Sequence, residues 1–174
     1  MRHALPRVGL ARRTAALHED RNGDPAAAEP FHRVVIEGGA PEPAAFESLE
    51  RLYRQSGRWP DLHTLYGTWV ERLTDDGARV ALFIEEGRLL EDVLDQPEDA
   101  VGALERAVAL DPANAEVSSA LDRLYERLGR WESLVTLLSR SIEQGRGADE
   151  TTELRLRRAE TLELKLARVA AAFV

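Results

Sequence analysis

The chain has 174 residues, with 23 basic and 31 acidic side chains and a formal net charge of −8 at pH 7. It contains no cysteine, which excludes disulfide scaffolds, thiolate metal sites and cysteine nucleophiles. The acidic balance argues against nucleic-acid binding, and no run approaches the roughly 18–20 apolar residues of a membrane-spanning helix. We therefore expect no nucleic acid and no membrane as partner, and take the cytoplasm as the default location.

Apolar residues recur at spacings of three and four along the chain, and this pattern predicts an all-α fold. Proline and glycine mark helix ends, as at Pro97 and Gly129. The pattern predicts about nine helices, at residues 4–20, 25–37, 43–56, 59–73, 77–94, 97–110, 114–128, 131–143 and 149–173. They form a single array over 1–174, with hairpins at 4–37, 43–73, 77–110 and 114–143 and an unpaired terminal helix at 149–173.

Two segments have local alternatives. Residues 32–38 are rich in β-branched side chains, so a strand is the alternative there, but the helical phase outweighs it. The first 20 residues contain four arginines and no acid before Glu19, which also fits an amphipathic transit peptide. Because the same stretch fits the repeat described next, we interpret it as an ordinary helix.

An internal repeat organises the sequence. The segment 49–71 aligns without a gap on 121–143, and eleven of the 23 positions are identical, whereas chance would supply about one or two. The same offset of 72 also pairs flanking positions, such as Leu82 with Leu154. One phase therefore runs through nearly the whole chain, which indicates an array of repeats.

The residues from Pro112 onward resemble the tetratricopeptide repeat, whose motif spaces W-x2-L-G-x2-Y, A-x3-F and P over 34 residues. The matching positions are Pro112, Leu121, Tyr125, Leu134 and Leu138, and the departures are Ser118 for the motif Trp and Asp122 for its Gly. The resemblance implies a right-handed α-solenoid of roughly 4.5 repeats. It also implies a non-catalytic scaffold that binds a peptide or partner protein along the concave groove of the superhelix.

The register of the resemblance implies which side chains of the first helices face that groove. They are Glu47, Arg51, Arg54, Ile84, Arg88, Glu91, Ser119, Arg123, Glu126, Arg127 and Glu160. Arg51, Arg88 and Arg123 recur at one phase, and guanidinium groups suit carboxylates, which favours an acidic peptide. The alternative is that each arginine pairs with a neighbouring glutamate and faces water. With one lysine in the chain, the carboxylate clamp of chaperone-binding members is absent.

Other residue types give no sign of catalysis. The four histidines lie far apart, and no metal-ligand spacing, phosphate-binding loop or nucleophile motif occurs. We therefore expect no enzyme activity, metal or cofactor; the alternative is a regulatory or substrate-recognition segment of a larger multidomain enzyme. RNA binding by the arginines is disfavoured by the net charge.

Two further features lead to expectations about packing. Trp59 and Trp131 each follow Gly-Arg at a helix start, and we expect them in the core with Tyr53 and Tyr125; exposed anchors for a ligand are the alternative. The last predicted helix finishes on the apolar VAAAFV, unlike a polar cap. Self-association through this helix, or a longer natural chain, would explain that ending.

Overall fold

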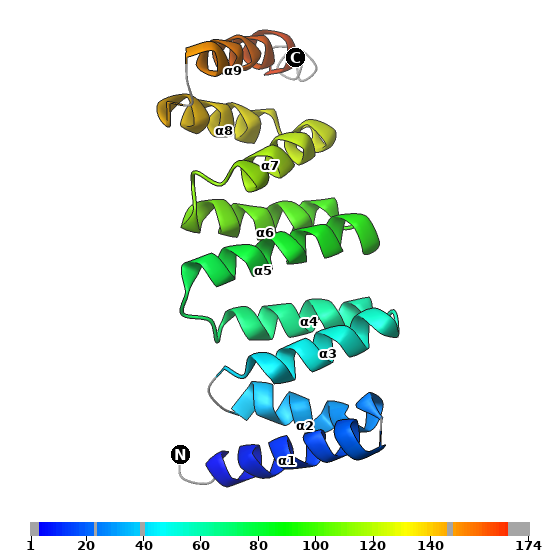
Figure 1. Cartoon of the computed structure of the whole chain (residues 1–174). Helices are drawn as coiled ribbons and strands as arrows, with labels where there is room; N and C mark the ends of the chain where they lie inside the picture. Colours follow the sequence, from blue (N-terminus) through cyan, green and yellow to red (C-terminus); the bar gives the residue numbers. More distant parts are fainter. Residues whose placement is uncertain (1–3, 23, 39–40, 146–147, 167–174) are drawn as a thin grey trace. The chain divides into compact units, whose positions relative to one another are not determined.

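The computed structural model describes residues 4–22, 24–38, 41–145 and 148–166, and within these ranges it contains nine α-helices, two π-helical segments and no strand (Figure 1). The elements are α1 (Ala4–Asn22), α2 (Pro25–Gly38), α3 (Pro43–Gln55), α4 (Trp59–Val70), α5 (Asp76–Arg88), η1 (Leu89–Val93), α6 (Pro97–Leu110), α7 (Ala115–Leu128), α8 (Trp131–Glu143), α9 (Ala148–Glu160) and η2 (Thr161–Leu166). The predicted all-α fold of helix hairpins is confirmed. The strand alternative at 32–38 is wrong, because those residues belong to α2.

The chain divides into two compact units. Unit 1 comprises Met1–Leu82 and Asp92–Leu94, and unit 2 comprises Phe83–Glu91 and Asp95–Val174. A single array over the whole chain, and its handedness, stay predictions.

Unit 1 is built by helices that pack on their neighbours in sequence, α1 on α2, α2 on α3 and α3 on α4. Its core includes the fully buried Leu49, Leu62 and Tyr66. Phe46 of α3 stacks on Trp69 of α4, with 4.9 Å between ring centroids and an interplanar angle of 14°. This aromatic contact joins the two helices of the second hairpin.

Unit 2 repeats this pattern, with α6 on α7, α7 on α8 and α8 on α9. The fully buried Leu121, Leu124 and Leu134 form its centre. Gly87 of α5 is needed for close helix approach, because a Cβ atom there would lie 3.1 Å from Leu104 Cγ on α6. Gly57 and Gly129, 72 residues apart, follow α3 and α7 with φ of +65° and +66°, a conformation that glycine adopts without strain.

The two π-helical segments also begin 72 residues apart, at Leu89 and Thr161. A π-helical turn takes in more residues than an α-helical turn, so neighbouring side chains lie closer to the same face. Leu89 and Leu90 are consequently both buried, and Glu91 follows directly. The hydrophobic pattern predicts only continuous helices at 77–94 and 149–173, so this local widening is a new finding.

The prediction for the tryptophans is wrong in part. Trp59 and Trp131 are half-buried, whereas Tyr53 and Tyr125 are buried as expected. Each tryptophan is the first residue of its helix, and its indole Nε1 lies near the preceding turn glycine, at the edge of the hairpin. The buried tryptophan is Trp69, at 5% exposure.

The apolar VAAAFV sequence lies outside the described residues. Helix α9 packs on α8, and Leu156 of α9 and Leu162 of η2 are exposed. Self-association through this helix stays a prediction.

Candidate functional site

The eleven predicted groove residues lie on the first helices of their hairpins. In unit 1 they are Glu47, Arg51 and Arg54 on α3; in unit 2 they are Ile84 and Arg88 on α5, Glu91 on η1, Ser119, Arg123, Glu126 and Arg127 on α7, and Glu160 at the end of α9. All are exposed except Ile84, which is half-buried, and Glu91, whose side chain is nearly covered. Several of those in unit 2 contact one another or residues of an adjacent first helix.

Glu91, Arg123 and Arg127 form the first group, called here the Glu91 cluster. Arg123 donates from Nη1 and Nη2 to the two carboxylate oxygens of Glu91, at 2.6 and 2.8 Å. Arg127, one helical turn further along α7, donates from Nη1 to Oε1 at 3.0 Å. The Glu91 side chain is 6% exposed, whereas those of Arg123 and Arg127 are 60% and 46% exposed. The carboxylate therefore lies beneath two guanidinium groups that face solvent.

Asp122, Glu126 and Arg157 form a second group, the Arg157 cluster, in which the charges are reversed. Arg157 of α9 donates to Asp122 and, at 2.5 Å, to Glu126 Oε1, both on α7. Burial of the guanidinium lowers the pKa of Arg157, but the hydrogen bonds to the two carboxylates outweigh it, so the pKa is raised. Helix α7 thus presents a basic pair towards η1 and an acidic pair towards α9.

Arg88 forms the third group with Glu85 and Glu116, the Arg88 cluster. It donates to Glu85 Oε1 of its own helix at 2.6 Å and to Glu116 at the start of α7. Arg88 and Arg123 therefore pair with neighbouring glutamates, as the alternative to an arginine ladder proposed. Counting three side chains each, the Glu91 cluster has a charge of +1, and the Arg88 and Arg157 clusters have −1.

Helix α3 of unit 1 carries a different arrangement. Arg54, which occupies the position of Glu126, donates to Glu50 Oε1 at 3.1 Å and to the Tyr66 hydroxyl at 2.7 Å. The Tyr66 hydroxyl donates in turn to Glu50, at 2.6 Å. Arg51 contacts Ser48 Oγ at 3.5 Å, and Gln55 stands where unit 2 has Arg127. The pair of arginines four residues apart on α7, Arg123 and Arg127, therefore has no counterpart on α3, where Gln55 stands in place of the second arginine.

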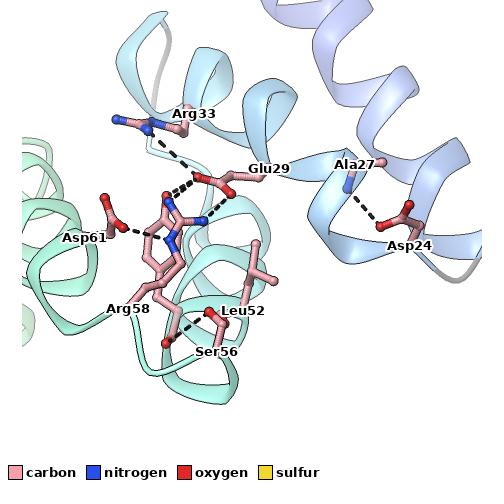
Figure 2. Close-up of polar contacts among 9 residues, drawn as sticks. Asp24, Ala27, Glu29, Arg33, Leu52, Ser56, Arg58 and Asp61 are labelled. Atoms are coloured by element: carbon pink, nitrogen blue, oxygen red, sulfur yellow. Dashed lines mark hydrogen bonds and ion pairs between the residues drawn. The ribbon is translucent and has the colours of Figure 1, made fainter.

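A separate polar cluster joins the first two hairpins of unit 1 (Figure 2). Glu29 of α2 accepts two hydrogen bonds from Arg58, at 2.6 and 3.0 Å, and one from the Tyr53 hydroxyl at 3.0 Å. Arg58 also donates to Asp61 at 2.7 Å, and Arg33 lies 3.8 Å from Glu29. Burial and the contact with Glu29 raise the pKa of Tyr53 to about 12, so its phenol stays protonated. These contacts fix the turn between α3 and α4 against α2.

Glu29 makes the stability of unit 1 sensitive to acid. The hydrogen bonds from Arg58 lower the pKa of Glu29 below its ordinary value of 4.5, although burial opposes this. Because the folded pKa is lowered, the contribution is complete above pH 4.5 and is lost as the pH falls through the lowered pKa. We expect Glu29→Gln to be less stable at pH 7 and to show a shallower loss of stability between about pH 5 and pH 3. Urea unfolding across that range measures this, and parallel curves for both proteins would contradict it.

Each unit also contains a surface hollow between a second helix and the hairpin that follows. The hollow of unit 1, about 70 Å³, is lined by Arg33, Ile36, Glu37, Leu49, Tyr53, Asp61, Thr64, Leu65 and Thr68. The hollow of unit 2, about 340 Å³, is lined by Glu105, Val108, Ala109, Leu121, Tyr125, Ser133, Thr136, Leu137 and Arg140. Each position in the first set lies 72 residues before its counterpart in the second. None of the eleven predicted groove residues lines either hollow.

The described residues contain no group of three or more histidine, aspartate or glutamate side chains placed to hold a metal ion. His18 stacks on Phe31 with 5.5 Å between ring centroids, His32 is buried in α2, and His63 lies half-buried on α4. Within the same part of the chain, no helix combines the length and apolar character needed to cross a membrane.

Sequence reasoning missed Asp122, Glu116 and Arg157 as members of this surface. The signal was present for the first: Asp122-Arg123 and Glu126-Arg127 repeat an acid–base pair one helical turn apart. Because each acid is four residues from the other, and each base four residues from the other, the two acids lie along one side of α7 and the two bases along another. Which residues of neighbouring helices meet those edges depends on tertiary packing.

Part of the chain matches a known protein family, and the chain is similar to several solved structures. Residues 118–150, which include most of α7 and all of α8, match the model of the tetratricopeptide repeat family. Among solved structures, the chain is similar to MamA, described as the RS-1 ArsTM double mutant, with 16% identity, 95% of this chain and 96% of that chain covered, and a TM-score of 0.48. It is also similar to a thermophilic TPR protein of Thermus thermophilus, with 20% identity, 92% and 100% coverage, and a TM-score of 0.36. No curated protein matches the chain.

Proposed function

We propose that the chain is a non-catalytic scaffold that binds an acidic peptide or protein segment across the first helices of its hairpins, because it is built of helix hairpins and its residues 118–150 match the tetratricopeptide repeat model. Helical repeats stack into extended surfaces, and these surfaces serve protein binding in general. The acidic character of the partner is our own inference from the charges of unit 2.

The observation that supports this proposal is the exposed basic pair of the Glu91 cluster. Arg123 and Arg127 lie one turn apart on α7, and about half of each side chain is open to solvent. Guanidinium groups bind carboxylates through paired hydrogen bonds, so this part of the surface suits an acidic segment. The Arg88 and Arg157 clusters, each with two acids to one arginine, would orient basic residues of the same partner.

Charge reversal on the two helices of one hairpin tests the proposal. Arg123→Glu on the first helix α7 should abolish partner capture, because it places a carboxylate where the partner's acid would bind. Arg140→Glu on the second helix α8 makes the same change in net charge at an exposed arginine beside the hollow. We expect it to retain the partners of the wild type. Affinity enrichment followed by cross-linking mass spectrometry, with circular dichroism to confirm folding, measures both.

The opposite pattern would contradict the proposal. Loss of capture by Arg140→Glu with retention by Arg123→Glu would move the binding surface to the hollow between α6, α7 and α8. Retention of every partner by the triple variant Arg51→Glu/Arg88→Glu/Arg123→Glu would show that the recurring arginines at these three positions are not used.

A further inference from the structure

The Glu91 cluster has the composition of a carboxylate-binding site that already holds a carboxylate of the same chain. Both terminal nitrogens of Arg123 donate to separate oxygens of Glu91, and Arg127 adds a third hydrogen bond. This paired geometry is the one by which a guanidinium recognises a carboxylate group of any source. A partner's aspartate or glutamate side chain offers the same two oxygens.

Exposure differs sharply between the members of the cluster. The carboxylate is almost covered, at 6%, whereas the guanidinium side chains are 60% and 46% exposed. A second carboxylate can therefore approach both arginines from solvent. The three side chains have a charge of +1, so an incoming acid is attracted to them. On the other side of α7, Arg157 pairs with both Asp122 and Glu126, which leaves that cluster with a charge of −1.

The position of Glu91 in η1 allows its side chain to leave while the backbone stays in place. Leu89 and Leu90, the residues directly before it, are buried and hold the π-helical turn in the core. The Gln96 amide donates to the Leu90 carbonyl at 2.8 Å and closes the end of this turn. Releasing the arginines consequently requires rotation of one glutamate side chain and no unfolding of the helix.

We propose that Arg123 and Arg127 bind a carboxylate of the acidic partner, and that Glu91 occupies this site until the partner's carboxylate replaces it. The inference rests on the proposed function, because it concerns the same surface and the same class of partner. When a partner's carboxylate replaces Glu91, one ion pair is lost and another forms, so a single acidic residue adds little binding free energy. A segment with several consecutive acidic residues binds more tightly, because when one acid leaves the arginines, its neighbour is at high local concentration and binds in its place.

Fluorescence anisotropy with labelled hexaglutamate at low ionic strength tests the exchange. Glu91→Gln removes the competing charge with little change of shape, and should bind the peptide roughly two- to fivefold more tightly than the wild type. Glu163→Gln is the matched control, because Glu163 lies 72 residues after Glu91, is exposed in η2, and gives the same change in net charge. It should bind like the wild type. Adding Arg123→Gln and Arg127→Gln to Glu91→Gln should abolish the gain, and hexaglutamine should not bind.

Three results would overturn the inference. They are equal affinities for Glu91→Gln and Glu163→Gln, weaker binding by Glu91→Gln than by the wild type, and no hexaglutamate binding by any variant. The proposed function would stand or fall separately, on the comparison of Arg123→Glu with Arg140→Glu. If Glu91→Gln loses helix content by circular dichroism, Glu91→Asp, whose shorter side chain reaches the arginines less well, should shift the affinity in the same direction.

Discussion

Replacing Trp69 with alanine should lower the free energy of unfolding by about 3–5 kcal/mol. Trp69 is 5% exposed, and its ring stacks on Phe46 across the α3–α4 hairpin. Phe46 also contacts the buried Tyr66, with 6.0 Å between ring centroids. Removing the indole therefore leaves a void beside Phe46 and exposes apolar surface that α3 and α4 otherwise share.

The same helix provides the control. Trp59 is half-buried at the first position of α4, so Trp59→Ala should lower stability less, by about 1–2 kcal/mol. Trp69→Phe, which keeps a ring against Phe46, should also be milder than Trp69→Ala. Urea unfolding followed by far-ultraviolet circular dichroism gives the order of the three variants. A larger effect at Trp59 than at Trp69 would contradict the assignment of Trp69 as the core tryptophan.

Leu49→Ala and Leu121→Ala should each lower the free energy of unfolding by about 2–5 kcal/mol. Both leucines are fully buried, and each lies at the floor of the hollow of its own unit, 72 residues from the other. A cavity forms in each case, because the side chains around the site belong to three different helices and cannot collapse into it without shifting those helices.

An exposed leucine is the matched control for this pair. Leu10 of α1 is largely exposed, and Leu10→Ala should change stability by no more than about 0.5 kcal/mol. Chemical denaturation of the three purified variants measures all values. A near-neutral Leu49→Ala beside a strongly destabilising Leu121→Ala would show that positions 72 apart do not share a packing role.

The fold could be predicted from the sequence wherever a residue type restricts the backbone. The predicted boundaries of 97–110 and 131–143 coincide with α6 and α8, because Pro97 begins one helix and Gly129 ends the helix before the other. The prediction of 59–73 was three residues too long, since α4 ends at Val70 without a glycine or proline. The π-helical turns could not be predicted, because α and π turns share nearly the same hydrophobic pattern.

The candidate site could be predicted only as a set of exposed positions. The register of the resemblance predicts Arg123 and Arg127 among the groove residues, and both contact Glu91 from one face of α7; that this face binds a partner stays a prediction. Their contact with Glu91 joins residues 32 and 36 positions apart, so it depends on how η1 packs beside α7. For Trp59 and Trp131, the position after Gly-Arg at a helix start was interpreted as a sign of core packing, but both residues are only half-buried.

The contacts between first helices in unit 2 have an evolutionary consequence. Arg123 and Glu91, or Arg157 and Asp122, lie in different hairpins, so neither member of a pair can change sign without leaving its counterpart mismatched. Related chains should therefore vary at these positions in a correlated way, with charge swaps occurring together or both members becoming neutral. A repeat inserted into such a protein, or exchanged between two of them, would be tolerated only where the charged side chains of its first helix are opposite in sign to those they meet on the adjacent hairpins.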